Sequence, residues 1–237
     1  MSVSKDSYGE DIFPFGAMYA PVARATEVPV SEWESDIARM KELGFTIIRS
    51  WAAWDRIERV EGQRDFEKLD YVFQLAEKNE LKITLFIGGA FSSLMGCYPP
   101  VWLRNRCQRQ TEVSRERDAE LSLCFDDPLY REKAEDFLRE LIDRYASHPA
   151  LHSWIVWGEP AWNGCRCPKT VAAYRKWLQG RYDTLALLNE AWSSEAPHDY
   201  DRWEDVQPVS CGYAPSIDWH RFCEDHLNEV IGCVTDL

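Results

Sequence analysis

Short apolar runs alternate with amphipathic segments along the chain. The runs that predict buried strands cover residues 13–20, 45–50, 81–87 and 151–157. Apolar residues at helical spacing predict helices at residues 31–43, 66–79, 128–146, 170–182, 184–192 and 216–235. This alternation of strand and helix is typical of the crossover units of a parallel sheet.

The ends of two predicted helices carry residues that favour those positions. Ser31 is expected to cap the first helix, and Gly44 is expected to end it. Asp127 is the expected cap of the 128–146 helix, with Pro128 at its first position. Residues 90–127 show little periodicity beyond a helical turn near Trp102, and so long a loop in a compact domain indicates a functional role.

Two architectures accommodate these units, an open doubly wound sheet and an eight-stranded barrel. No glycine fingerprint of the kind that binds a diphosphate follows any predicted strand, which favours the barrel. Four strands by residue 157 make half of a barrel, whose usual length is roughly 250 residues. We therefore expect residues 1–237 to form the N-terminal half to five-eighths of one (β/α)8 TIM barrel domain, truncated at its C-terminus.

The charge balance excludes several classes of partner. The chain has 27 Lys and Arg against 40 Asp and Glu, a net charge of −13, which repels nucleic acid and anionic membrane surfaces. No window has the roughly 18 consecutive apolar residues of a membrane span, and the N-terminus lacks the apolar core of a signal peptide. We expect a cytoplasmic protein whose eight cysteines are free thiols or metal ligands.

Candidate catalytic residues follow the predicted strands, because function in such barrels gathers at the carboxyl ends of the strands. Arg49 either holds an active-site carboxylate or pairs with a structural acid. Glu159 follows Trp157 and Gly158. Aromatic neighbours that exclude water raise the pKa of a carboxyl, as a general acid near neutral pH requires, so we favour a catalytic Glu159 over a surface glutamate.

The 11 tryptophans divide by position. Trp51, Trp157 and Trp162 follow strand ends and are expected near substrate, where aromatic faces stack on sugar rings. Tryptophans at helical spacing are expected in the core, namely Trp33, Trp177 and Trp192.

Several motifs resemble those of one enzyme family. Residues 154–160, Trp-Ile-Val-Trp-Gly-Glu-Pro, resemble the strand-four motif of retaining glycoside hydrolases. The segments that narrow the resemblance to glycoside hydrolase family 42, the β-galactosidases, are residues 33–44, 48–54 with Glu58, 61–62, 65–66, 99–103, 128–132, 174–178 and 182–192. The similarity covers nearly the whole chain from about residue 15, and Leu188-Asn-Glu-Ala-Trp192 is its most specific part.

The resemblance implies a retaining β-galactosidase that needs no cofactor and acts on a carbohydrate. Glu159 matches the acid/base, and Arg49 matches the arginine that positions the nucleophile. The family's nucleophile lies at the end of the seventh strand, outside this chain. By resemblance the complete protein forms a homo-oligomer, a trimer.

Three positions depart from the family pattern. Gly158 replaces the asparagine before the acid/base, and Glu120 stands where the family has a substrate-binding arginine four residues before a cysteine. Cys124, Cys165 and Cys167 match three family zinc ligands, but Thr170 replaces the fourth. The three thiolates either keep a structural zinc with a ligand from elsewhere or are remnants of a lost site.

Two alternatives to the β-galactosidase reading stay open. The departures also fit a degenerate barrel that binds carbohydrate without hydrolysing it, and a clan relative that cuts glucan or mannan fits the strand-four motif. We expect residues 1–237 alone to have no glycosidase activity and to associate through open sheet edges.

Overall fold

The computed structural model describes residues 12–23, 28–87, 98–111, 121–158, 164–193, 199–209 and 213–237. The chain divides into two compact units. The first comprises residues 1–105, 134–158 and Leu237, and the second comprises residues 106–133 and 159–236. The long helix α6, Pro128–Tyr145, starts in the second unit and ends in the first.

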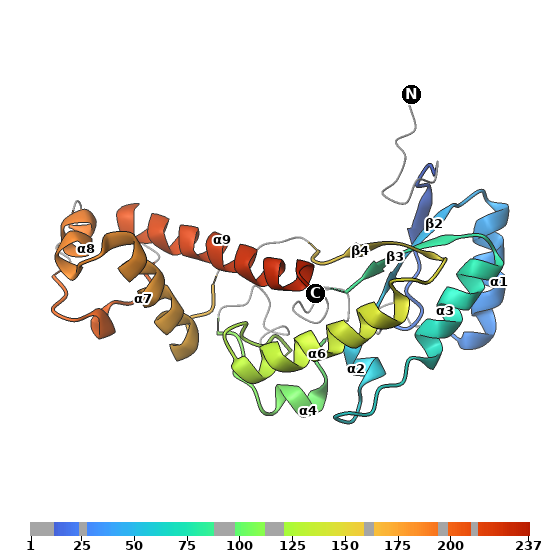
Figure 1. Cartoon of the computed structure of the whole chain (residues 1–237), viewed down its shortest axis with the longest axis horizontal. Coiled ribbons are helices and arrows are strands. Elements are labelled where there is room, and N and C mark those ends of the chain that lie inside the picture. Colours follow the sequence, from blue (N-terminus) through green and yellow to red (C-terminus); the bar gives the residue numbers. More distant parts are fainter. Residues whose placement is uncertain are drawn as a thin grey trace. The chain divides into compact units, whose positions relative to one another are not determined.

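A four-stranded parallel sheet forms the centre of the first unit (Figure 1). Its strands are β1 (Gly16–Met18), β2 (Ile47–Trp51), β3 (Lys82–Phe86) and β4 (Leu151–Ile155), in the spatial order β1-β2-β3-β4. Helix α1 (Val30–Glu42) connects β1 to β2, α3 (Glu67–Lys78) connects β2 to β3, and α6 lies between β3 and β4. Each strand pairs with its successor and the order never reverses, whereas a doubly wound sheet reverses at its switch point. The described sheet therefore has the arrangement of consecutive units of a (β/α)8 barrel, as expected.

The two faces of the sheet differ in polarity. Ile48, Ile83 and Leu85 are fully buried on one face, and α3 packs against β3. On the other face the register aligns Arg49 with Thr84, and Thr84 with Ser153. Side chains alternate across a strand, so one set faces the helices while the polar set faces the side that becomes the interior of a barrel.

Most helix ends agree with the sequence, but one cap is wrong. Gly44 adopts φ 84° and ends the α1 helix, and Asp127 caps α6 by accepting the N–H groups of Leu129 and Tyr130 at 3.1 and 3.2 Å. Ser31 is not the cap of α1, because the extended backbone already ends at Pro29 and the helix begins at Val30. The turn near Trp102 is confirmed as α4, Val101–Arg104.

The loop after β2 is organised around one buried carboxylate, Glu58, which is 2% exposed. Its Oε2 accepts from Trp54 Nε1 and from Arg64 Nε, both at 2.9 Å, and its Oε1 accepts from Gly62 N at 2.9 Å. Trp54 begins α2 (Trp54–Ile57), a short helix that the sequence pattern did not predict. Gly62 has φ 75°, which favours glycine, so the Glu61-Gly62 motif reflects the geometry of this loop.

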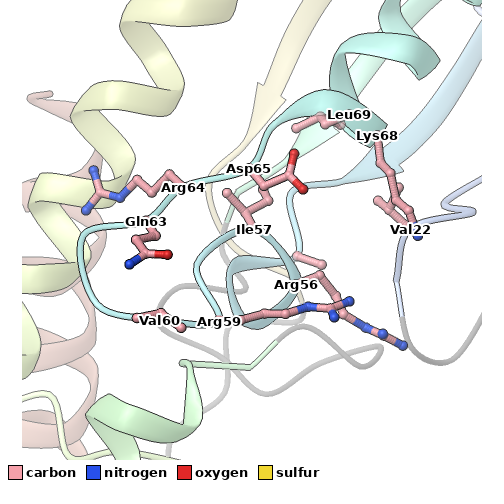
Figure 2. Close-up of a pocket in the computed structure, with 11 residues that line it drawn as sticks. Val22, Arg56, Ile57, Arg59, Val60, Gln63, Arg64, Asp65, Lys68 and Leu69 are labelled. Carbon is pink, nitrogen blue, oxygen red and sulfur yellow. The ribbon is translucent and has the colours of Figure 1, made fainter.

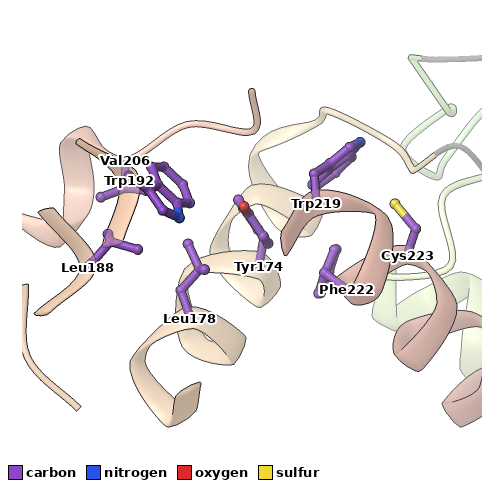
Figure 3. Close-up of a cluster of buried hydrophobic side chains, with 8 residues drawn as sticks. All are labelled: Tyr174, Leu178, Leu188, Trp192, Val206, Trp219, Phe222 and Cys223. Carbon is purple, nitrogen blue, oxygen red and sulfur yellow. The ribbon is translucent and has the colours of Figure 1, made fainter. Parts of the chain in front are cut away.

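The second unit holds α7 (Pro168–Tyr182), α8 (Leu185–Trp192), the 3₁₀ turn Trp203–Asp205 and α9 (Tyr213–Thr235). Figure 3 shows the hydrophobic core that joins these helices, with Tyr174 and Leu178 from α7, Leu188 and Trp192 from α8, and Trp219, Phe222 and Cys223 from α9. Burial confirms Trp33 and Trp192 as core residues, and Trp177 packs at the border of this core while partly buried. No helix among the described residues is long and apolar enough to cross a bilayer.

Candidate functional site

The carboxyl ends of β2, β3 and β4 meet at one edge of the sheet, because the strands are parallel. The register places Trp51 beside Phe86, and Phe86 beside Ile155. Trp51 and Phe86 are each 1% exposed and pack with three alanines from the loops after β1 and β2, namely Ala20, Ala23 and Ala53. This apolar layer closes the carboxyl edge of the sheet.

Arg49 lies next to that layer, and its side chain is exposed. The guanidinium carbon is 5.0 Å from the centre of the Trp51 ring and 5.6 Å from that of Phe86. Among the described residues no carboxylate pairs with Arg49. The alternative that Arg49 pairs with a structural acid therefore has no support there. Rings that hold the guanidinium from one side leave its N–H groups available to a ligand or to another carboxylate.

The structure describes four of the seven residues expected at the sugar and the acid/base. Arg49 and Trp51 lie on β2, and Trp157 and Gly158 follow β4 and are partly buried. Glu159, Trp162 and Glu120 lie outside the described residues. Glu159 is the residue after Gly158 in the chain and follows Ile155, the last residue of β4, by four positions.

A separate cavity of about 550 Å³ lies in the first unit beside α2 and the start of α3 (Figure 2). Arg56, Arg59, Arg64 and Lys68 line it, with Asp65 as its acidic residue. Arg64 is already engaged by Asp136 at 2.7 Å and Glu140 at 2.5 Å. None of the residues predicted at the active site lines this cavity, and its basic lining suits an anion better than a neutral sugar.

The second unit brings together the three cysteines that the sequence singled out. The sulfur atoms of Cys124, Cys165 and Cys167 lie within 4.8 Å of one another, and all three residues are at most 1% exposed. The Sγ atoms of Cys124 and Cys167 are 3.4 Å apart. Among the described residues no other group of three or more Cys, His, Asp or Glu side chains is close enough to hold a metal ion.

Hydrogen bonds favour the ligating form of one of these thiols. The N–H of Thr111 donates to Cys165 Sγ at 3.4 Å, and the Cys124 thiol lies close by. The Cys124 thiol and the Thr111 hydrogen bonds lower the pKa of Cys165 against the effect of burial. In turn, Cys165 and burial raise the pKa of Cys124. Thiolate is the form that binds metal, and the N–H donor suits a negatively charged sulfur.

Polar residues lie next to the cysteine cluster, on the side that no cysteine occupies. Thr170 Oγ1 lies 3.2 Å from Cys124 Sγ and 3.6 Å from Cys167 Sγ. The same oxygen donates to Asp126 Oδ2 at 2.6 Å, and Asp126 Oδ1 is 2.9 Å from His226 Nε2. Burial raises the pKa of Asp126, but the close contact with His226 and the hydrogen bond from Thr170 outweigh it, and the pKa lies below its ordinary value.

Sequence reasoning missed Asp126 and His226 at this cluster. Asp126 follows Cys124 by two residues, and this proximity was an available signal. His226 stands on α9, a hundred residues later, and only the folded chain brings it there. Of the other cysteines, Cys223 is buried and Cys107 and Cys233 are partly buried, while Cys97 and Cys211 lie outside the described residues.

Comparison with known proteins gives a consistent match. The family model described as beta-galactosidase, glycoside hydrolase family 42, matches residues 24–236. The β-galactosidase BgaH of Haloferax lucentense is 31% identical over 212 residues, which are 83% of this chain and 31% of that protein. The β-galactosidase BglY of Alicyclobacillus acidocaldarius is 30% identical over 201 residues, 81% of this chain and 28% of that protein.

Solved structures match in the same way. The β-galactosidase from Halorubrum lacusprofundi has a TM-score of 0.72 and 25% identity over 91% of this chain and 33% of its own. The β-galactosidase from Bacillus circulans has a TM-score of 0.73 at 23% identity, over 93% of this chain and 34% of its own, which supports the fold alone. The chain thus spans about a third of the length of the relatives that it matches.

Proposed function

Because this chain belongs to glycoside hydrolase family 42, we propose that it is the part of a retaining β-galactosidase that carries the acid/base. The observation that supports the proposal best is the convergence of β2 and β4 at one edge of the sheet. Arg49 and Trp51 come from β2, and Trp157 and Gly158 follow β4, with only β3 between the two strands. Glu159 comes next in the chain.

In the proposed reaction Glu159 first protonates the glycosidic oxygen and later removes a proton from the attacking water. Retention needs a second carboxylate about 5–5.5 Å away, which forms the glycosyl-enzyme intermediate. We propose that this nucleophile comes from outside residues 1–237, in keeping with relatives that are about three times longer. Arg49 then positions that nucleophile with N–H groups that no described carboxylate occupies.

The aromatic residues have two roles in this proposal. Trp51 and Phe86 support the Arg49 guanidinium, and Trp51, Trp157 and Trp162 form the apolar side of the sugar site. Gly158 adds no side chain to the sugar site, and we propose Glu120, which lies outside the described residues, as a further substrate contact. A galactoside is the expected substrate because the matched relatives are named β-galactosidases.

The proposal is tested with Glu159→Gln in the full-length protein. We expect kcat on lactose or an alkyl galactoside to fall by about 10²–10⁴-fold, the usual contribution of general acid–base catalysis. With a dinitrophenyl galactoside the first step needs no acid, so the intermediate should accumulate, and azide should restore turnover as glycosyl azide. Glu159→Asp serves as the variant that retains a carboxyl group.

Two results would contradict the proposal. Wild-type rates for Glu159→Gln on both substrates would exclude Glu159 as the acid/base. A folded wild-type protein that hydrolyses no glycoside, yet binds oligosaccharides in a calorimetric titration, would favour the non-catalytic alternative. A glucan or mannan as the best substrate in the same screen would favour a clan relative.

The proposed hydrolysis needs no cofactor, since carboxylates supply both the proton and the nucleophile. We further propose a structural zinc held by Cys124, Cys165 and Cys167, whose mutual distances suit thiolate ligands. When bound, such an ion stabilises the folded unit by linking the Cys124 loop to the start of α7.

None of the six described cysteines forms a disulfide, which supports the proposed cytoplasmic location. We also propose that the complete protein is a homotrimer, which sedimentation equilibrium tests.

A further inference from the structure

We propose that the hydroxyl oxygen of Thr170 is the fourth ligand of a metal site with Cys124, Cys165 and Cys167, and that Asp126 and His226 orient it. A threonine at the start of a helix is otherwise a residue that caps or packs. Here its side chain is completely buried against two sulfur atoms and a carboxylate. The proposal does not depend on the glycosidase activity.

The distances fit a four-ligand site. A tetrahedral zinc with Zn–S near 2.3 Å and Zn–O near 2.1 Å has S···O edges of about 3.6 Å and S···S edges of about 3.8 Å. The Thr170 oxygen is 3.2 Å from Cys124 Sγ and 3.6 Å from Cys167 Sγ, and these sulfurs are 3.4 Å apart. The Thr170 oxygen therefore meets the required edges to Cys124 and Cys167 to within a few tenths of an ångström.

The hydroxyl proton points away from the sulfurs. A threonine hydroxyl has one proton and two acceptor lone pairs, and an ionised carboxylate only accepts. Asp126 Oδ2 is 2.6 Å from the Thr170 oxygen, closer than either sulfur, so the proton is donated to Asp126. The lone pairs of the oxygen then face the cysteine sulfurs, which is the orientation that a cation bound among them requires.

Asp126 is held in place for this role. Its other oxygen is 2.9 Å from His226 Nε2, and His226 Nδ1 is 3.3 Å from Glu229 Oε2. The His226 ring is stacked on Phe222 with centroids 5.1 Å apart. Carboxylate and histidine partners behind a ligand fix its orientation in metal sites, so Asp126 and His226 are positioning residues here.

Asp126 is not itself the fourth ligand in this geometry. The described donor atoms that lie mutually within 4.8 Å are the three sulfurs without the Asp126 carboxylate. The carboxylate therefore lies one atom behind the Thr170 oxygen. Replacement of a cysteine by threonine at this corner exchanges a thiolate for a neutral oxygen, which leaves a zinc complex with one negative charge less.

Cobalt(II) titration of the metal-free full-length protein under anaerobic conditions tests the site, because cobalt absorbance reports the ligand set without any enzyme assay. We expect one Co(II) per chain, with thiolate charge-transfer bands. Thr170→Val keeps the shape but removes the oxygen, and should weaken Co(II) binding by about tenfold or more. Thr170→Ser should bind within about threefold of wild type, and Thr170→Cys should raise the charge-transfer absorbance by about a third through a fourth thiolate.

Asp126→Asn tests whether Thr170 or Asp126 supplies the oxygen ligand. The amide oxygen still accepts the Thr170 proton, so we expect unchanged band positions. Because the amide is uncharged and a weaker acceptor than the carboxylate, we expect weaker Co(II) binding. Cys223→Ala, a buried thiol outside the cluster, should leave the titration unchanged, whereas Cys165→Ala should abolish it. Circular dichroism of each metal-free variant confirms that it is folded.

Three outcomes would overturn the proposal. The first is a wild-type chain that binds no Co(II). The second is a Thr170→Val titration with wild-type affinity and spectrum. In the third, Asp126→Asn shifts the bands and Thr170→Val does not, which would make Asp126 the direct ligand.

Discussion

The guanidinium of Arg49 lies over the Trp51 ring, with its carbon atom 5.0 Å from the ring centre, and both residues come from the same face of β2. Residues two apart on a strand share a face, so the ring that closes the carboxyl edge also supports the arginine. This relationship leaves the N–H groups of Arg49 for contacts at the proposed active site.

Arg49→Met in the full-length protein should lower kcat/KM on a nitrophenyl galactoside by roughly 10²-fold, because a misplaced nucleophile loses the benefit of orientation. The variant should stay folded, since Arg49 is exposed and an exposed cation–π contact contributes about 0.5–1 kcal/mol. Steady-state kinetics and thermal unfolding check both statements. Arg39→Met, an exposed arginine paired with Glu42 on α1, is the matched control. Equal loss of activity in both variants would contradict the assignment.

Glu58→Ala should reduce the free energy of unfolding by about 3 kcal/mol, because it removes three acceptor contacts and leaves the nearly buried Arg64 with one carboxylate fewer. Urea denaturation measures the change. Glu80→Gln, in the exposed pair with Lys41, should change stability by less than about 0.5 kcal/mol. A Glu58→Ala value as small as that of the control would show that the loop holds without the carboxylate.

Asp70 should make stability depend on pH in the acid range. Burial raises the pKa of Asp70, but hydrogen bonds from Arg144 and Tyr145 outweigh it, so the folded-state pKa lies below the ordinary value. The contribution is therefore complete above about pH 4, the pKa of unfolded aspartate, and is lost as the pH falls through the folded-state pKa.

Asp70→Asn should accordingly flatten the acid limb of stability against pH, measured as urea midpoints between pH 3 and 7. Asp143→Asn, exposed on the same helix as Arg144, should leave the limb as in wild type. A wild-type acid limb in Asp70→Asn would show that other groups cause it.

Leu188→Ala should destabilise the core of α7, α8 and α9 by about 2–5 kcal/mol, because the removed methyl groups leave a cavity in a fully buried site. The neighbouring Leu187 is 49% exposed, and Leu187→Ala should cost less than about 1 kcal/mol. Thermal denaturation of the two variants compares adjacent leucines on one helix. Equal losses would contradict the packing.

Residues 1–237 expressed alone should self-associate and lack glycosidase activity. In the described sheet β1 and β4 each pair on one side only, and β4 has neither Lys nor Pro to discourage edge pairing. Sedimentation velocity at several concentrations checks the first expectation. A single monomeric species with a cooperative thermal transition would contradict it, and hydrolysis abolished by Glu159→Ala would contradict the second.

The sequence alone determined the succession of strands and helices, because hydrophobic periodicity and capping are local. For this reason the sequence correctly predicted the end of a helix at Gly44, the cap at Asp127 and the strand that begins at residue 151. It did not predict that β4 ends at Ile155, and Ser31 does not cap its helix. The catalytic position of Glu159 stays a prediction, because Glu159 lies outside the described residues. The short helix α2 was not predicted, because contacts of Glu58 hold it rather than its own periodicity.

Tertiary structure decided which side chains meet. The register of β2 and β3 places Phe86 beside Trp51, and thereby gives Arg49 its apolar support without a described acidic partner. The fold likewise brings His226 from α9 to Asp126, which lies a hundred residues earlier in the chain. Asp126 contacts His226 through one carboxylate oxygen and accepts the Thr170 hydroxyl proton with the other. Such contacts join residues far apart in the chain, and they depend on packing and loop closure, on which local sequence patterns carry no information.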